Sequence, residues 1–181
     1  MLLPLKCHPQ STSPAVTAID VELIRENNAL ALHFCLSGDI EHLTIPPREI
    51  SERRDNLWRH TCFEAFIGVP TRPEYLELNF SPATHWAAYR FCDYRHGQTN
   101  AVNIDPPMIE TQTEPGRFEM VVSLKNVSPA PDLKDDLQWR IGLSAVIEET
   151  QGGLSYWALN HPPGKPDFHH SDCFALQLGS A

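Results

Sequence analysis

Short runs of alternating apolar and polar residues constrain the fold of this chain more than any other feature of its sequence. Three such runs follow one another in residues 62–69, 75–81 and 85–91. Successive side chains on a β-strand point to opposite faces, so each run has one apolar face and one mixed face. No window keeps the three-to-four spacing of an amphipathic helix over a dozen residues. The pattern therefore predicts strands, with short helices or none.

Further runs of this kind, with frequent turn signals between them, predict an antiparallel sandwich or flattened barrel. Sixteen prolines and nine glycines are spread along the 181 residues, a length that suits one domain with a sizeable core. We expect a loosely held lead-in over residues 1–15 and a single β-domain over 16–178. The other predicted strands are 16–25 as an opening edge strand, 30–36, 102–108 as an edge strand, 118–124, 139–147 and 154–159.

Charge and cysteine content exclude several classes of partner. A formal net charge of −9 disfavours binding to nucleic acid or to an anionic membrane surface. The longest apolar runs fall far below the roughly 20 residues that a membrane-spanning helix needs. Five scattered cysteines without a CxxC pair are typical of free thiols in a reducing compartment, so we expect a cytoplasmic protein.

A mixed acidic and aromatic face is the main candidate for a binding site. If the three central strands pair in the order written, Glu64, Glu77 and Asn79 share one face. Carboxylates accept hydrogen bonds from hydroxyl groups, and indole rings stack on flat sugar faces, so this mixture suits a carbohydrate or a similar polar ring. Trp58 and Trp86 are the expected stacking platforms. The residues expected near the margins of this face are Trp58, His60, Trp86 and Arg90.

Two alternatives remain open for the same face. One-sided antiparallel sheets normally expose a polar face to solvent, and such a face needs no ligand. The pair Glu64 and Glu77 could instead be glycosidase carboxylates, since cross-strand neighbours lie about 5 Å apart, a spacing compatible with a retaining enzyme. The sequence itself indicates no deep cleft for that chemistry.

A histidine-rich loop near the C-terminus is the second candidate site. Imidazole and carboxylate groups can bind a transition metal, and the candidate ligands are His161, His169 and His170. Adjacent histidines on extended backbone point to opposite sides, so His169 and His170 are poorly placed to share one ion. Histidines that bond to Asp167 or Asp172 and fix the loop are the alternative.

Several segments resemble the DOMON-like domain family. They are LWRHTCFEAF from Leu57, YLELNFSP from Tyr75, LSYWAL from Leu154 and GKPDFHH from Gly164, and the likeness covers about residues 16–178. The chain is more distantly similar to the family 9 carbohydrate-binding modules, in which a tryptophan precedes a strand that carries a glutamate. Trp58 and Glu64 match that motif, and Trp157 matches a second aromatic residue.

The resemblance implies an immunoglobulin-like β-sandwich that binds haem or a sugar and has no catalytic activity of its own. Haem-binding DOMON domains ligate iron through methionine, lysine or histidine. Met108 and Met120 do not fit that pattern, which leaves His60, His85 and His170 as candidate axial ligands. We therefore expect a non-catalytic module for a small molecule, most simply a carbohydrate, with a haem or metal binder and a glycosidase-like enzyme as alternatives.

Overall fold

Every pairing between two strands is antiparallel. The structure is a computed structural model that describes residues 1–130, 132 and 138–179, and these residues form twelve strands. The strands are β1 (Leu2–Cys7), β2 (Val16–Glu26), β3 (Ala29–Gly38), β4 (Cys62–Gly68), β5 (Tyr75–Phe80), β6 (Trp86–Phe91), β7 (Thr99–Asn100), β8 (Met108–Glu114), β9 (Arg117–Leu124), β10 (Trp139–Glu148), β11 (Leu154–Ala158) and β12 (Leu176–Leu178). Three short 3-10 helices are η1 (Ile40–His42), η2 (Leu57–Arg59) and η3 (Ser171–Cys173).

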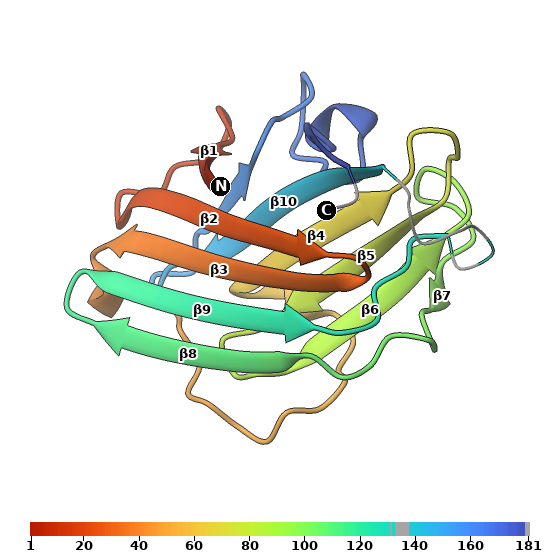
Figure 1. Ribbon diagram of the computed structural model, residues 1–181. Helices are drawn as coiled ribbons and strands as arrows, with labels where there is room; N and C mark the ends of the chain where they lie inside the picture. Colours follow the sequence, from red (N-terminus) through yellow and green to blue (C-terminus); the bar gives the residue numbers. More distant parts are fainter. Residues whose placement is uncertain (131, 133–137, 180–181) are drawn as a thin grey trace.

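The strands form two layers that lie face to face (Figure 1). One layer has the order β2-β3-β9-β8, and the other has the order β7-β6-β5-β4-β10-β11. Strand β1 joins them, because it pairs with β2 along one edge and with β11 along the other. This arrangement confirms the predicted all-β antiparallel sandwich, and the described part of the chain contains no α-helix.

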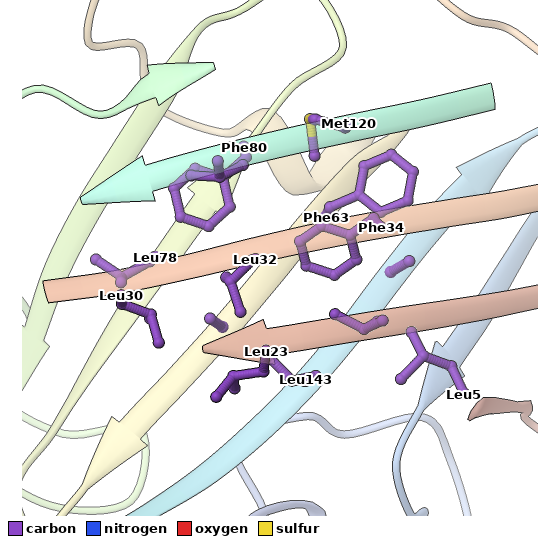
Figure 2. Close-up of a cluster of buried hydrophobic side chains, with 14 of the residues drawn as sticks. Leu5, Leu23, Leu30, Leu32, Phe34, Phe63, Leu78, Phe80, Met120 and Leu143 are labelled. Carbon is purple, nitrogen blue, oxygen red and sulfur yellow. The ribbon is translucent and has the colours of Figure 1, made fainter. Parts of the chain in front are cut away.

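Apolar side chains from both layers fill the space between them (Figure 2). Phe34 of β3, Phe63 of β4 and Phe118 of β9 meet at its centre, with ring centroids 5.0 and 5.8 Å from that of Phe63. Alternation along each strand puts these residues on its inner face, as the sequence predicts. Full burial of one such side chain stabilises the fold by about 1.5–3 kcal/mol.

Strands β4 and β5 are unusual because both of their faces are covered. Every residue of both strands is buried. On the outer face, the segment from residue 160 to 174 packs against the sheet, and a second apolar cluster there includes Phe66, Tyr75, Phe168 and Phe174. The mixed face is therefore not the solvent-facing side of a one-sided sheet, and that alternative is wrong.

A glycine on β10 allows this outer segment to lie close to the sheet. A Cβ atom at Gly142 would stand 3.0 Å from the carbonyl oxygen of Cys173 and 3.5 Å from the Cβ of Phe66. The contact with Cys173 is tighter than a Cβ atom normally makes, so glycine permits the close approach of η3 to the strand.

Three expectations about strand positions are wrong. Residues 2–7 form β1 instead of a loosely held lead-in, because Leu5 is buried in the core and the strand pairs on both edges. As a result, β2 is an interior strand and not an edge strand. Residues 102–107 form no strand, and the edge strand β8 begins only at Met108.

The hairpin predicted at Gly152-Gly153 is confirmed, since β10 and β11 pair on either side of it and Gly152 has a φ of 90°.

All five cysteines are free; Cys62 and Cys173 are buried and Cys92 is exposed. Among the residues described, no helix has the length and apolar character needed to span a bilayer.

The central aromatic cluster makes a direct test of the core. We expect Phe63→Ala to lower the free energy of unfolding by about 3–5 kcal/mol, because it leaves a cavity between the layers. Ile24, which is 58% exposed on β2, provides the control, and Ile24→Ala should change stability by less than about 0.5 kcal/mol. Urea unfolding measures both. A loss below about 1 kcal/mol for Phe63→Ala would contradict the described packing.

Candidate functional site

The strand register brings the polar residues of the mixed face together. Glu64 of β4 lies directly opposite Asn79 of β5 on one side and Ser144 of β10 on the other. Glu77 stands two residues before Asn79, so its side chain projects from the same face of β5. Residues paired directly across antiparallel strands share a face, and the three predicted residues therefore do so here.

These side chains line a cavity of about 500 Å³ on the outer face of the second layer. This volume falls within the range of small-molecule sites. Trp58, 48% exposed, and the exposed Lys165 stand where the cavity meets solvent, whereas Glu64 and Glu77 are 2% and 6% exposed at its inner end. The lining residues are Trp58, Glu64, Phe66, Glu77, Tyr89, Phe91, Arg95, Gln98, Val146, Tyr156, Lys165, Pro166, Phe168 and His169.

Each carboxyl group is held by one neutral donor from the sheet. The Ser144 hydroxyl donates to Glu64 Oε2 at 3.0 Å, and the Asn79 amide donates to Glu77 Oε1 at 2.7 Å. The Cys62 thiol contacts Asn79 Oδ1 at 3.7 Å and orients that amide. One oxygen of each carboxyl group therefore remains available on the cavity side.

Burial disfavours the charged form of both carboxyl groups. It raises the pKa of Glu64 from about 4.5 to about 8, and the nearby Glu77 carboxyl adds to this rise while the Ser144 hydrogen bond opposes it. Burial also raises the pKa of Glu77, against the hydrogen bond from Asn79 and the positive charge of Arg95. Glu64 therefore carries a proton at neutral pH.

His169 forms one wall of the cavity as a neutral ring. Its Nδ1 atom shares a hydrogen bond of 2.8 Å with the Tyr75 hydroxyl, and its ring contacts Phe66 and Phe91 edge-on at centroid distances of 5.1 Å. Burial lowers the pKa of His169 to about 4. Its Nε2 atom lies 3.6 Å from Glu77 Oε2, which is beyond hydrogen-bond length.

Arg95 belongs to a separate ion pair at the rim of the cavity. Its guanidinium donates to Asp167 Oδ1 at 3.2 and 2.7 Å, and the Tyr94 hydroxyl also donates to that carboxylate. Arg95 has a φ of 51°, an uncommon conformation for a residue with a side chain. Its backbone N–H donates to the Tyr75 hydroxyl at 3.2 Å, which fixes the turn against the sheet.

Three predicted site residues lie on the opposite face. Trp86 pairs directly with Phe80 and packs against the main core, so it cannot act as a stacking platform in the cavity. Arg90 donates to the carbonyl oxygens of residues 129 and 128 at 2.6 and 3.1 Å. Trp157 is buried in the core opposite Ala145, with its indole N–H bonded to Ser155 at 3.0 Å.

His60 stands outside the cavity lining, where its exposed ring bonds to Glu148 at 2.8 Å. Tyr89 and Tyr156 reach the cavity instead, from β6 and β11. The alternation of side chains along the strands could have predicted both tyrosines at the cavity. Tyr89 has the opposite parity to Trp86, and the Gly152-Gly153 hairpin places Tyr156 opposite Val146 on the outer face of β10.

The predicted histidine ligands are dispersed. His161 bonds to the Lys6 carbonyl oxygen at 2.8 Å, and His170 accepts from the Asp172 backbone N–H at 3.2 Å. His85 lies 3.3 Å from a carboxylate oxygen of Glu49. Within the described residues, no group of three or more histidine, cysteine or acidic side chains is arranged to hold a metal ion. The contacts of His170 agree with the alternative in which histidines fix the loop.

A second, larger groove of about 810 Å³ lies between residues 38–48 and 111–118. Its charged side chains, such as Asp39, Arg48 and Glu114, are all exposed. Solvent screens such groups strongly, whereas the buried carboxyl pair of the first cavity is screened much less. The first cavity is therefore the candidate site.

Comparison with known proteins supports the fold. No protein-family model and no curated protein sequence matches the chain. A crystal structure of a protein from Bacteroides uniformis, for which carbohydrate binding has been suggested, is similar with a TM-score of 0.72 and 14% identity, over 100% of this chain and 86% of that one. A family 9 carbohydrate-binding module from Caldicellulosiruptor kristjanssonii, solved with cellotriose, is similar with a TM-score of 0.50 and 12% identity, over 90% of this chain and 75% of that one. At these identities the similarity shows a shared fold, and membership of the DOMON-like family stays a prediction.

The raised pKa of Glu64 gives the protein a characteristic pH dependence. In the unfolded chain this carboxyl ionises near pH 4.5, but in the folded protein it keeps its proton up to about pH 8. The folded state binds more protons in that window, so stability falls as pH rises and levels off above pH 8. Glu64→Gln, which cannot ionise, should remove up to about 1.4 kcal/mol per pH unit of that slope.

Urea unfolding at several pH values between 6.5 and 8 measures this effect. The window begins at 6.5 because the lowered pKa of His169 has the opposite consequence, a loss of stability as pH falls toward 4. Glu110→Gln on the exposed side of β8 is the control and should keep the wild-type slope. An unchanged slope for Glu64→Gln would show that Glu64 is ionised in the folded protein.

Proposed function

We propose that this protein is a non-catalytic carbohydrate-binding module whose ligand enters the cavity between Trp58 and the inner carboxyl pair. The observation that carries the proposal is the placement of Glu64 and Glu77, both buried and both facing one cavity with aromatic walls. Aromatic rings stack on the apolar faces of sugar rings, and carboxyl groups pair with their hydroxyls. The proposed location is the cytoplasm, since all five cysteines are free thiols.

Each end of the cavity has a distinct proposed role. At the outer end, Trp58 provides a flat surface for the sugar ring. At the inner end, protonated Glu64 donates a hydrogen bond and the free oxygen of Glu77 accepts one, so the pair can bind both a hydroxyl oxygen and a hydroxyl hydrogen. Asn79 acts indirectly, by holding Glu77 through its amide.

The comparisons support binding more than hydrolysis. The similar structure from Caldicellulosiruptor kristjanssonii is a carbohydrate-binding module in complex with cellotriose, and the similarity to this chain is one of fold. A retaining glycosidase needs one ionised carboxylate as nucleophile beside one protonated acid. Neither carboxyl group here has a hydrogen-bonded cation to stabilise the charge of a nucleophile, and burial raises the pKa of both. We therefore propose no turnover at this site.

Isothermal titration calorimetry against neutral and charged mono- and oligosaccharides tests the proposal. Trp58→Ala should weaken binding by about 5- to 30-fold, because stacking on the indole contributes about 1–2 kcal/mol. Trp58→Phe, which keeps a flat ring, should recover part of the loss.

Ile50→Ala, at a residue 88% exposed on the loop before η2, is the control and should bind as the wild type does. Absence of binding to every sugar at millimolar concentration would contradict the proposal. Release of hydrolysis products during the same incubation would contradict its non-catalytic part.

A further inference from the structure

The inner end of the cavity holds two carboxyl groups that have no hydrogen-bonded cation. Glu64 and Glu77 each accept one hydrogen bond from a neutral donor, from Ser144 and Asn79 respectively. Among the described residues, the other oxygen of each carboxyl group has no hydrogen-bond donor. His169 is the nearest basic group to Glu77, but at 3.6 Å it makes no hydrogen bond, and its lowered pKa leaves it uncharged.

The two cations at the cavity, Arg95 and Lys165, make no direct ion pair with these carboxyl groups. The Arg95 guanidinium donates to Asp167 at 3.2 and 2.7 Å, and its positive charge acts on Glu64 and Glu77 without direct contact. Lys165 is exposed at the rim. An unpaired buried carboxylate is costly, and the free protein lowers that cost by keeping a proton on Glu64.

Aromatic side chains surround the space in front of the carboxyl pair. The face of an aromatic ring carries partial negative charge and attracts a cation, most strongly when water is excluded. Neutral sugar hydroxyls would gain from hydrogen bonds alone, whereas an ammonium group would gain from the rings and the carboxylates together. The aromatic residues of the wall are Trp58, Phe66, Tyr89, Phe91, Tyr156 and Phe168.

We propose that the ligand carries a protonated amine, which the free oxygens of Glu64 and Glu77 receive at the inner end of the cavity. The inference rests on the proposed carbohydrate function and narrows it to an amino sugar. An ammonium group has three donors, enough for both free oxygens and one further acceptor.

Binding of the amine couples to release of a proton. The free protein holds Glu64 as a neutral acid; in the complex Glu64 is a carboxylate beside the ammonium group, and its proton passes to the buffer. The groups that face Glu64 are Cys62, Glu77, Asn79, Ser144, Arg95 and His169. Burial raises the pKa of Cys62 and lowers that of His169, so neither releases a proton near pH 6.5.

Calorimetric titration at pH 6.5 with glucosamine, glucose and N-acetylglucosamine tests the inference. Repeating each titration in two buffers with different ionisation enthalpies counts the protons released. We expect glucosamine to bind at least about tenfold more tightly than the two uncharged sugars, because its hydrogen bonds are charge-assisted. Its binding should also release up to one proton from the protein per molecule of glucosamine bound.

Matched variants assign the effect to the carboxyl pair. Glu77→Gln should remove most of the preference for glucosamine and affect glucose less. Glu64→Gln should abolish proton release. Glu110→Gln, exposed on β8, should change neither. Circular dichroism confirms that each variant is folded before titration.

The outcomes separate this inference from the proposed function. Glucose that binds as tightly as glucosamine, without proton release, overturns the inference and leaves carbohydrate binding in place. Cyclohexylamine that binds as tightly as glucosamine supports amine recognition and contradicts a saccharide ligand. Failure of every sugar and of cyclohexylamine to bind overturns both proposals.

Discussion

Burial of β4 and β5 on both faces is the constraint on which the site depends. One face of these strands packs against the layer formed by β2, β3, β8 and β9, and the other lies beneath the segment 160–174. The polar side chains of the outer face therefore have little contact with bulk solvent, and Glu64 and Glu77 are only 2% and 6% exposed. Buried polar groups need partners, and buried charges need counter-charges or a proton. The chemistry of Glu64 and Glu77 follows from that requirement.

The covering segment creates the cavity as well as the burial. Phe168 and His169 close one side of it, and Phe174 packs behind Phe66 at a centroid distance of 6.0 Å. Gly142 lets η3 approach the sheet, and the pair Arg95 and Asp167 connects the loop after β6 to the same segment. The residues that enclose the carboxyl pair thus come from segments far apart in the sequence, and only the folded chain brings them close together.

Much of the architecture could be predicted from alternation alone. The runs in β3, β4, β5, β9 and β10 have clear inner and outer faces, and the shared face of Glu64, Glu77 and Asn79 follows from pairing neighbouring strands in order. Strict alternation also predicts that Trp86 lies on the core side of its strand. Trp86 is an odd number of residues from Tyr89, which faces the cavity, so the two side chains point to opposite faces. Trp86 was expected at the site for its chemistry, against the parity of its strand.

Other features could not be predicted from local patterns. Strand β1 alternates, with Pro4 and Lys6 exposed and Leu5 buried, but its pairing with two strands is a tertiary effect that this short run does not reveal. Arg95, Gln98 and Lys165 lie in loops, where no periodicity indicates the direction of a side chain. The charge state of Glu64 depends on a covering segment 100 residues further along the chain. Sequence alternation predicts which face carries the carboxyl groups, but their pKa values require the packed structure.

Both proposals depend on Glu64 being a neutral acid in a ligand-binding cavity. Carbon-13 NMR of the Glu64 side-chain carboxyl, followed from pH 4 to 9 with and without a saturating saccharide, tests it most directly. We expect a titration midpoint near 8 in the free protein and a clear displacement of that midpoint when the saccharide binds. A midpoint near 4.5 that the saccharide leaves unchanged would contradict both the buried acid and its role in binding.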